Sequence, residues 1–299
     1  MSDEDLAKIG VELLAALENH LVEAHHASGG SVGNSLIASA SLGGPCYMSC
    51  RVADDADGAI YVADMEQAGT SYPPPVVCDE ATGKCLVLVT PDAERSMNTY
   101  LGASAGLSIE QLDEQAIVDS EFVYIEGYLV TSPTGLDAAV RTREIAQAAG
   151  VPVALSFSDP GMVEHFPEQF KQIVGDGLDL VFANEAEALQ WTGTEDITTA
   201  ASAMKSTAKQ FAITLGADGA VCFDGEQLHK IAGHAITAVD SNGAGDMFAG
   251  AFLYAITHGE NVATAGTFAS RAAAQVVSQW GPRLRADQYG TLKSEFFGA

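Results

Sequence analysis

The strongest candidate for chemistry is a polar, glycine-rich turn at residues 240–246 that opens directly into an apolar helical pattern. Gly243, Ala244 and Gly245 carry little or no side chain, so successive backbone N–H groups are left uncovered at the positive end of the helix dipole. Such a position suits phosphoryl oxygens. The turn therefore predicts a phosphate-binding, catalytic segment.

Asp246 lies in the first turn of this predicted helix, beside the expected anion. A carboxylate there is well placed to accept a proton from an attacking hydroxyl, as a general base does in phosphoryl transfer. The alternative is an N-terminal aspartate that only complements the helix dipole. We interpret Asp246 as the catalytic base.

A second glycine turn, Gly29-Gly30, precedes another helical stretch. Without side chains, the two glycines allow a ligand to lie against the backbone, and Asn34, one turn further on, can reach a ribose hydroxyl. The alternative is an ordinary helix-capping turn. These three residues are candidates for binding the hydroxyl-bearing acceptor.

Two predicted strands end in residues that suit a ligand. Asn184 and Glu187 follow one strand with a spacing of three, which places both side chains on one face of a helix. The next strand ends in Thr214 and Gly216, at the edge where ligands collect in open parallel sheets. The threonine hydroxyl and the glycine amides are candidates for contacting that ligand. An ordinary acidic first-turn residue is the alternative for Glu187.

The elements that must position these residues alternate between strand-like and helix-like patterns. Strand–helix–strand order with short links implies right-handed crossovers and a mostly parallel sheet with helices on both faces. We therefore predict a doubly wound α/β fold. The predicted strands cover Phe122–Ile125, Val151–Phe157, Leu178–Ala183 and Phe211–Leu215, and the predicted helices cover residues 2–21, Ser31–Leu42, Thr134–Ala149, Met162–Val174 and Asp196–Ala208.

One stretch, between Tyr72 and Tyr100, interrupts this alternation. Three strand-like runs separated by turns fit a small antiparallel sheet: Val76–Cys78, Cys85–Thr90 and Ser96–Tyr100. An antiparallel insertion in a parallel α/β domain can act as a lid that closes water out of a site. An ordinary edge hairpin is the alternative. We predict one domain over residues 1–299, with a lid insertion at about 72–103.

The composition narrows the function classes. The formal net charge of −26 argues against a nucleic-acid partner, whose phosphates require Lys and Arg. A protein this acidic would hold a polyphosphate with backbone N–H groups, a helix N-terminus and a divalent cation. Neither a membrane span nor a secretory signal is indicated, so the cytoplasm is the expected location. The five cysteines are expected to be free thiols.

Four short elements, in order along nearly the whole chain, carry a resemblance to a known family. Asp240–Asp246 resembles the second signature of the ribokinase-like, or PfkB, carbohydrate and nucleoside kinases, and Gly29–Asn34 resembles the first. Asn184–Glu187 is similar to the family's Asn-x-x-Glu element, and Thr214–Gly219 to its nucleotide-binding turn. The resemblance implies a ribokinase-like fold and an enzyme that transfers the γ-phosphate of ATP to an alcohol group.

The resemblance also assigns the nucleotide side of the site. It implies that Glu187 orients Mg²⁺ through water while Asn184 faces the phosphates. The helix around Ser270 resembles the family's adenine-packing segment, although relatives often carry Asn at this position. A monovalent cation is a further cofactor that the resemblance leaves open. The remaining implied ATP contacts are Thr214, Gly216 and Gly219.

The acceptor side resembles bacterial adenosine-kinase-like members around Arg95 and Glu126. Glu126, at a strand end, would bind acceptor hydroxyls beside Gly30 and Asn34. Arg95 would steady the transferring phosphoryl group, unless it is a solvated lid arginine. Adenosine is the predicted acceptor, with another nucleoside or a ribose- or fructose-like sugar as the alternative. A monomer or a homodimer is expected.

The start of the chain departs from the family. Relatives begin with a strand that carries an acceptor-binding Asp, whereas this sequence begins with a pattern that resembles the helix after it. About thirty residues, one strand and part of a flap, would be missing. Two explanations stay open: a start assigned too late, or a truncated, inactive member that serves as a ligand sensor or scaffold.

Overall fold

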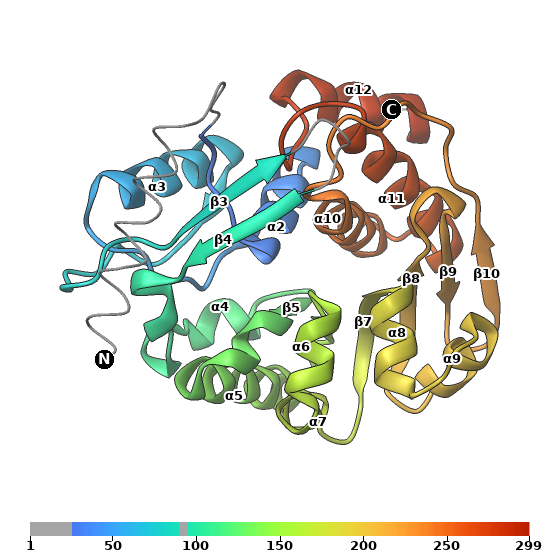
Figure 1. Cartoon of the computed structure of the whole chain (residues 1–299), viewed down its shortest axis with the longest axis horizontal. Coiled ribbons are helices and arrows are strands. Elements are labelled where there is room, and N and C mark those ends of the chain that lie inside the picture. The colour runs from blue at the N-terminus through green and yellow to red at the C-terminus, as the bar shows by residue number, and fades with distance from the viewer. Residues whose placement is uncertain (1–25, 90–94, 299) are drawn as a thin grey trace.

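The computed structural model describes residues 26–89 and 95–298, and its centre is a six-stranded sheet (Figure 1). The strands lie in the order β10-β9-β8-β7-β6-β5, so each pairs with its neighbour in the sequence. β5 to β8 are parallel, while β9 and β10 run antiparallel to their neighbours. The strands are β5 (Val123–Glu126), β6 (Val153–Ser156), β7 (Leu178–Asn184), β8 (Ala208–Thr214), β9 (Ala220–Phe223) and β10 (Leu228–Ile231).

Helices pack on both faces of this sheet. Along β6, Ala154 joins the core on one face, while Val153 and Leu155 join the core on the other. This alternation of buried side chains confirms the predicted doubly wound, mostly parallel α/β fold. The first face carries α2 (Ser31–Leu42), α10 (Ala244–Thr257), α11 (Val262–Val277) and α12 (Ala286–Phe297), and the second carries α5 (Pro133–Ala149), α6 (Pro160–His165), α7 (Pro167–Val174), α8 (Glu185–Thr192) and α9 (Ile197–Met204).

The helix α10 lies in the core, since every residue from Met247 to Ala255 is buried. It packs closely on α2: a Cβ at Gly250 would lie 2.2 Å from the carbonyl oxygen of Ser35. Only glycine permits this approach of one backbone to another. The contact between α2 and α10 holds the first turns of the two helices side by side, and both carry predicted site residues.

Two features of the main fold differ from the sequence predictions. The single helix predicted at Met162–Val174 is instead the pair α6 and α7, because Pro167 cannot continue a helix and the chain turns at Phe166. The helix α3 (Ala56–Ala68) was indicated by no sequence pattern; its N-cap Asp55 accepts a hydrogen bond from the Gly58 amide.

The predicted three-stranded sheet between Tyr72 and Tyr100 is a two-stranded hairpin. β3 (Lys84–Val89) pairs antiparallel with β4 (Arg95–Tyr100). The strand predicted at Val76–Cys78 is wrong, because Val76 makes only an isolated parallel bridge with Ala53. Three prolines, at residues 73–75, come directly before it and offer no N–H groups to a β-ladder.

The predicted helix at residues 2–21 lies outside the described residues. Within residues 26–89 and 95–298, no helix combines the length and the apolar character that crossing a membrane requires. All five cysteines are free.

The remaining elements are short. They are β1 (Cys46–Tyr47), β2 (Thr70–Ser71) and α4 (Glu114–Val118), with 3₁₀ turns η1 (Gly102–Gly106), η2 (Ile109–Gln111), η3 (Gly127–Thr131) and η4 (Gly216–Asp218).

Candidate active site

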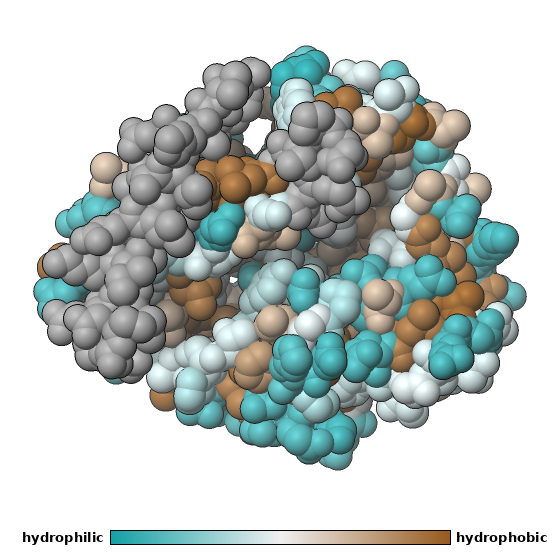
Figure 2. Space-filling view, viewed as in Figure 1, coloured by the Kyte–Doolittle hydropathy of each residue, from teal (hydrophilic) through white to brown (hydrophobic). Residues whose placement is uncertain are grey.

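A cavity of 2860 Å³ runs between the β3–β4 hairpin, the carboxyl ends of the parallel strands and the first turns of α2 and α10. Figure 2 shows a hollow in this region, between the hairpin and the part of the molecule that holds α5 and α6. Most of the sequence-predicted site residues line this one cavity: Gly29, Gly30, Asn34, Glu126, Asn184, Glu187, Thr214, Gly216, Gly243, Ala244, Gly245 and Asp246.

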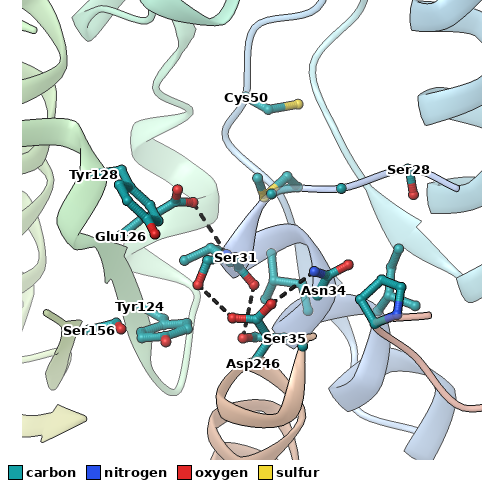
Figure 3. A pocket seen from close by; sticks show the side chains of 18 of the residues that line it. Ser28, Ser31, Asn34, Ser35, Cys50, Tyr124, Glu126, Tyr128, Ser156 and Asp246 are labelled. Carbon is teal, nitrogen blue, oxygen red and sulfur yellow. Dashed lines mark hydrogen bonds between the residues drawn. The ribbon is translucent and has the colours of Figure 1, made fainter. Parts of the chain in front are cut away.

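Asp246 lies in the first turn of α10 and is hydrogen-bonded to α2 (Figure 3). Its Oδ1 accepts a hydrogen bond from the Ser31 hydroxyl at 2.7 Å, and its Oδ2 accepts one from Asn34 Nδ2 at 2.8 Å. The two donors fix both the position and the rotation of the carboxylate. Asp246 is thus held with its two oxygens at the junction of α2 and α10, facing the cavity that both helices line.

The turn before Asp246 has the geometry of an anion cradle. Gly243 caps α10 with a φ of 72°, and a Cβ at this position would lie 2.3 Å from the carbonyl oxygen of Pro282. A Cβ at Gly245 would meet no atom within 4 Å. Ala244 and Gly245 are the first two residues of α10, so their N–H groups have no intrahelical acceptor. The Ala244 amide makes a long hydrogen bond of 3.4 Å to the carbonyl oxygen of Ser241, just outside the helix. Both amides lie at the helix start, a position that favours an anion.

The Gly29-Gly30 turn lies at the start of α2. Gly30 is the N-cap, with a φ of 87°, and its carbonyl oxygen accepts a hydrogen bond from the Asn34 amide at 2.9 Å. A Cβ at either glycine would have open space around it. Asn34 is 7% exposed, and its Oδ1 is buried without a hydrogen-bond partner in the described structure. A ligand hydroxyl donating to this oxygen would satisfy it.

Glu126 ends β5 on the opposite wall of the cavity. Its Oε2 accepts a hydrogen bond from the Val32 amide, in the first turn of α2, at 3.3 Å. Burial raises the pKa of Glu126 to about 7, and the nearby negative charge of Asp246 acts in the same direction. Figure 3 shows the Glu126 carboxyl group directed toward the first turn of α2, the side of the cavity where Ser31 and Asp246 lie.

Asn184 and Glu187 form a reciprocal cap at the start of α8. The backbone N–H of Glu187 donates to Asn184 Oδ1 at 2.9 Å. In return, the Glu187 carboxylate accepts hydrogen bonds from the backbone N–H of Asn184 and from its side-chain Nδ2, both at 2.8 Å. This is a capping box. Glu187 is 4% exposed, and burial raises its pKa to about 7.

The arrangement at Glu187 fits a hydrated magnesium ion. Each carboxylate oxygen has accepted one hydrogen bond and keeps capacity for a second, as from a metal-bound water. A nearby dication would also offset the cost of a buried carboxylate. Among the described residues, no group of three or more His, Cys, Asp or Glu side chains is arranged to ligate a metal directly. The fit is therefore to a metal held through water.

Thr214 and Gly216 lie at the carboxyl end of β8. Thr214 pairs with Asn184 in the β7–β8 register and its hydroxyl donates to the Ala183 carbonyl oxygen at 3.5 Å. Gly216 has a φ of 58° and open space around it. Gly219 is different: it does not line the cavity, and a Cβ there would lie 2.2 Å from the carbonyl oxygen of Ile231. Its role in the structure is to form a tight turn.

Besides Gly219, Ser270 is a predicted residue that the structure does not place in the cavity. Ser270, on α11, is 8% exposed, and its hydroxyl donates to the carbonyl oxygen of Ala232 at 3.0 Å. It does not line the cavity. Arg95 is the first residue of β4, and its side chain lies outside the described part of the structure.

Ser31 and Asp240 lie within the sequence motifs, but no role was predicted for either residue. Ser31 follows the Gly29-Gly30 turn directly, and a hydroxyl at a helix start often donates or accepts a hydrogen bond locally, which was the available signal. Asp240 accepts hydrogen bonds from the Asn242 amide at 2.9 Å and from the Gly281 amide at 3.1 Å. Asp240 thus joins the turn at residues 240–246 to a loop 41 residues away, which no local pattern could indicate.

Comparison with known proteins gives a consistent result. Residues 10–288 match the family model described as pfkB family carbohydrate kinase. The chain is 29% identical to the adenosine kinase of Dictyostelium discoideum over 264 residues, which are 81% of this chain and 75% of that protein. The solved adenosine kinase from Sinorhizobium meliloti has a TM-score of 0.91 at 32% identity, covering 99% of this chain and 94% of its own. A probable sugar kinase from Rhizobium etli CFN 42 has a TM-score of 0.89 at 33% identity, with 95% and 88% covered.

Proposed function

Since the chain belongs to the pfkB family of carbohydrate kinases and is thus a phosphotransferase with an alcohol acceptor, we propose that it transfers the γ-phosphate of ATP to the hydroxymethyl group of adenosine. The observation that carries the proposal is the position of Asp246. A carboxylate oriented by Ser31 and Asn34 lies in the same first turn of α10 as the Ala244 and Gly245 amides. A general base and an anion cradle are the two protein parts that phosphoryl transfer needs most.

The acceptor is held between α2 and β5 in this proposal. Its sugar hydroxyls lie against the Gly29-Gly30 backbone, one of them donates to Asn34 Oδ1, and another binds the Glu126 carboxyl group. The hydroxymethyl oxygen approaches Asp246. Because both Asp246 oxygens already accept hydrogen bonds, the incoming hydroxyl either replaces the Ser31 hydroxyl or shares its oxygen.

The transfer step then follows from this geometry. Asp246 accepts the hydroxyl proton while the acceptor oxygen forms a bond to the γ-phosphorus. The bond from that phosphorus to the β–γ bridging oxygen breaks, and ADP leaves with its electron pair. The amides of Ala244 and Gly245 donate to the γ-phosphoryl oxygens as negative charge moves across them.

ATP lies along the carboxyl ends of β7 and β8 in the proposed complex, with Thr214 and Gly216 beside its phosphates. Asn184 and Glu187 would hold Mg²⁺ through its bound waters, and the ion would supply neutralisation of phosphate charge. The β3–β4 hairpin acts as a lid over the acceptor, and the whole chain, with the insertion at about 72–103, works as one domain.

Two observations favour a nucleoside over a free sugar. Both adenosine kinases named above align with this chain over most of their length. The cavity wall near the first turn of α2 also carries the apolar and aromatic side chains of Met48 and Tyr61, and Tyr128 lines the cavity from η3, after β5; such side chains suit a flat nucleobase. A sugar of the ribose or fructose type is the second candidate, supported by the likeness to the probable sugar kinase.

The proposal is tested by calorimetric titration with ATP–Mg²⁺ and by measuring ADP release in the presence of adenosine, other nucleosides, ribose or fructose. We expect micromolar to millimolar ATP binding and a higher kcat/KM for adenosine than for either sugar. A preference for ribose or fructose would establish the second candidate. ATP binding without turnover of any acceptor would indicate a sensor or scaffold, and absence of ATP–Mg²⁺ binding would overturn the kinase assignment for this chain.

A further inference from the structure

Three segments far apart in the sequence meet around the backbone of Ser28, directly before the Gly29-Gly30 turn. The Ser28 amide donates to Asp64 Oδ2, on α3, at 2.9 Å. The Arg283 guanidinium, from the loop between α11 and α12, donates to the Ser28 carbonyl oxygen and lies 3.4 Å from the same Asp64 oxygen. We call these three residues the Ser28 clasp.

The Ser28 clasp is largely shielded from water. Ser28 is 6% exposed, and the side chains of Arg283 and Asp64 are 13% and 31% exposed. Burial alone would raise the pKa of Asp64, but the Ser28 amide and the Arg283 charge outweigh it and lower that pKa. Asp64 is therefore charged at neutral pH, and the pair is a shielded, charge-assisted contact, which has a larger effect than an exposed ion pair.

The same loop also touches the phosphate side of the site. The residue before Arg283, Pro282, packs against Gly243, and the residue before that, Gly281, donates its amide to Asp240. Gly243 and Asp240 belong to the turn that precedes Asp246. The loop therefore contacts the anion cradle through its backbone and the acceptor turn through the Arg283 side chain.

Within the described residues, the glycines of the Gly29-Gly30 turn make few contacts of their own besides the hydrogen bond from the Asn34 amide to the Gly30 carbonyl oxygen. A Cβ at either glycine would have no neighbour within 4 Å, and glycine has the widest backbone freedom of any residue. After the turn, the first turn of α2 carries Ser31 and Asn34, the two donors that orient Asp246. Whatever holds Ser28 thus sets where the turn enters α2.

We infer that Arg283 is a positioning residue for the acceptor: through the Ser28 backbone it holds the Gly29-Gly30 turn in register with the anion cradle. The inference rests on the proposed kinase function. It assigns Arg283 no contact with either substrate. Its loss leaves the nucleotide side of the cavity in place and loosens the surface against which the acceptor hydroxyls bind.

The test compares Arg283→Met, Arg283→Lys and Arg285→Met. Arg285→Met removes the same charge two positions away, where the side chain is 67% exposed and pairs with Asp287. For Arg283→Met we expect the acceptor KM to rise about tenfold or more and kcat to fall, because small displacements from the reactive geometry are costly. In the same variant we expect the KM for ATP to stay within about twofold of the native value, because the residues proposed to bind the nucleotide are unchanged. Arg283→Lys restores part of the acceptor KM because it keeps the charge, though not the fork of donors.

A second readout does not depend on turnover. Amide hydrogen exchange in residues 28–34 should be faster in Arg283→Met and in Asp64→Asn, with exchange in α10 unchanged. The two substitutions should be less than additive in the double variant, since they break one network. The inference would be overturned if Arg283→Met showed the same exchange rates and acceptor KM as Arg285→Met. It would also be overturned if Arg283→Met raised the acceptor KM and the ATP KM equally. If the native chain phosphorylates no acceptor, the proposed function fails, and the exchange comparison alone decides the role of Arg283.

Discussion

The two halves of the candidate site are built in different ways. The phosphate half rests on the core: α10 is buried from Met247 to Ala255, and the capping box at Asn184 follows a buried strand at the middle of the sheet. The acceptor half rests on the margin of the structure. It uses β5, which ends the strand order, and a two-stranded hairpin whose Met97 is 51% exposed.

The groups proposed to bind the substrates differ as well. On the phosphate half they are the backbone amides of a helix start, whose positions are set by the main chain, together with the side chains of Thr214 and of the Asn184–Glu187 cap. On the acceptor half they are side chains, Asn34 and Glu126, and a glycine turn held by the Ser28 clasp. From this difference we expect the chemistry to depend on rigid backbone geometry and the choice of acceptor to depend on contacts between distant segments. The predictions below test this contrast, from the largest expected effect to the smallest.

Asp246→Asn should have the largest effect. The amide cannot accept the acceptor's proton, so kcat should fall by roughly 10²- to 10⁴-fold, the usual contribution of a general base. Steady-state kinetics with adenosine and calorimetry with ATP–Mg²⁺ measure the two sides separately. ATP binding should persist, because the cradle amides remain. A variant that keeps native kcat would contradict the assignment of Asp246 as base.

Gly243→Ala and Gly245→Ala form a matched pair on the cradle. The added methyl at Gly243 would clash with Pro282 at a φ of 72°, so we expect a loss of stability of about 1–3 kcal/mol. At Gly245 the methyl has open space, so the thermal midpoint should be unchanged or higher.

The same pair separates folding from function. The Gly245→Ala methyl enters the space proposed for the γ-phosphoryl group, and kcat should fall roughly 10- to 100-fold, less than for loss of an oxyanion-hole donor because the amide itself remains. Thermal melting and kinetics on both variants provide the measurement. An active, stable Gly245→Ala enzyme would show that the cradle does not hold the transferred phosphate.

Glu126→Gln should act on the acceptor alone. We expect the acceptor KM to rise by about tenfold while the ATP KM stays constant, since one hydrogen bond to a charged partner is lost on one side only. Equal changes in the two KM values would contradict the contrast between the halves.

The same substitution should alter the pH dependence of stability. Burial raises the Glu126 pKa from 4.5 to about 7, so the folded state binds its proton more tightly than the unfolded state. The stabilising contribution is complete below pH 4.5 and is lost as the pH rises through about 7. Glu126→Gln should remove this loss and gain on the order of 2 kcal/mol relative to the native chain between pH 5 and pH 8. Chemical denaturation at the two pH values measures the difference.

Ser270→Ala should have the smallest effect on activity. Its hydroxyl donates to the Ala232 carbonyl oxygen within the core, so the substitution should cost about 1 kcal/mol in the free energy of unfolding. The ATP KM should change by less than about twofold, because the side chain does not line the cavity. A large rise in the ATP KM would instead support the adenine contact that the family resemblance implies.

The sequence predicted well those features that short, local patterns encode. The alternation of strands and helices, the glycine turns, and the Asn184–Glu187 cap are all local, and the structure places their residues in one cavity. Local reasoning failed where long-range contacts decide. Val76 pairs with Ala53 rather than forming a lid strand, and Ser270 finds a partner 38 residues away. Neither Asp240 nor Arg283 could be given a partner before the loop at 280–283 was placed.

The strand order has a further consequence, for the way the protein assembles. Every strand of the sheet pairs with the next one along the chain, so the sheet can grow stepwise, with little cost in loop closure. The contact between Ser31 and Asp246 instead spans 215 positions. A chain emerging from the ribosome could complete its sheet before these two residues meet. Catalytic competence should therefore be the last property gained during folding, and recovery of kinase activity should lag behind recovery of secondary structure.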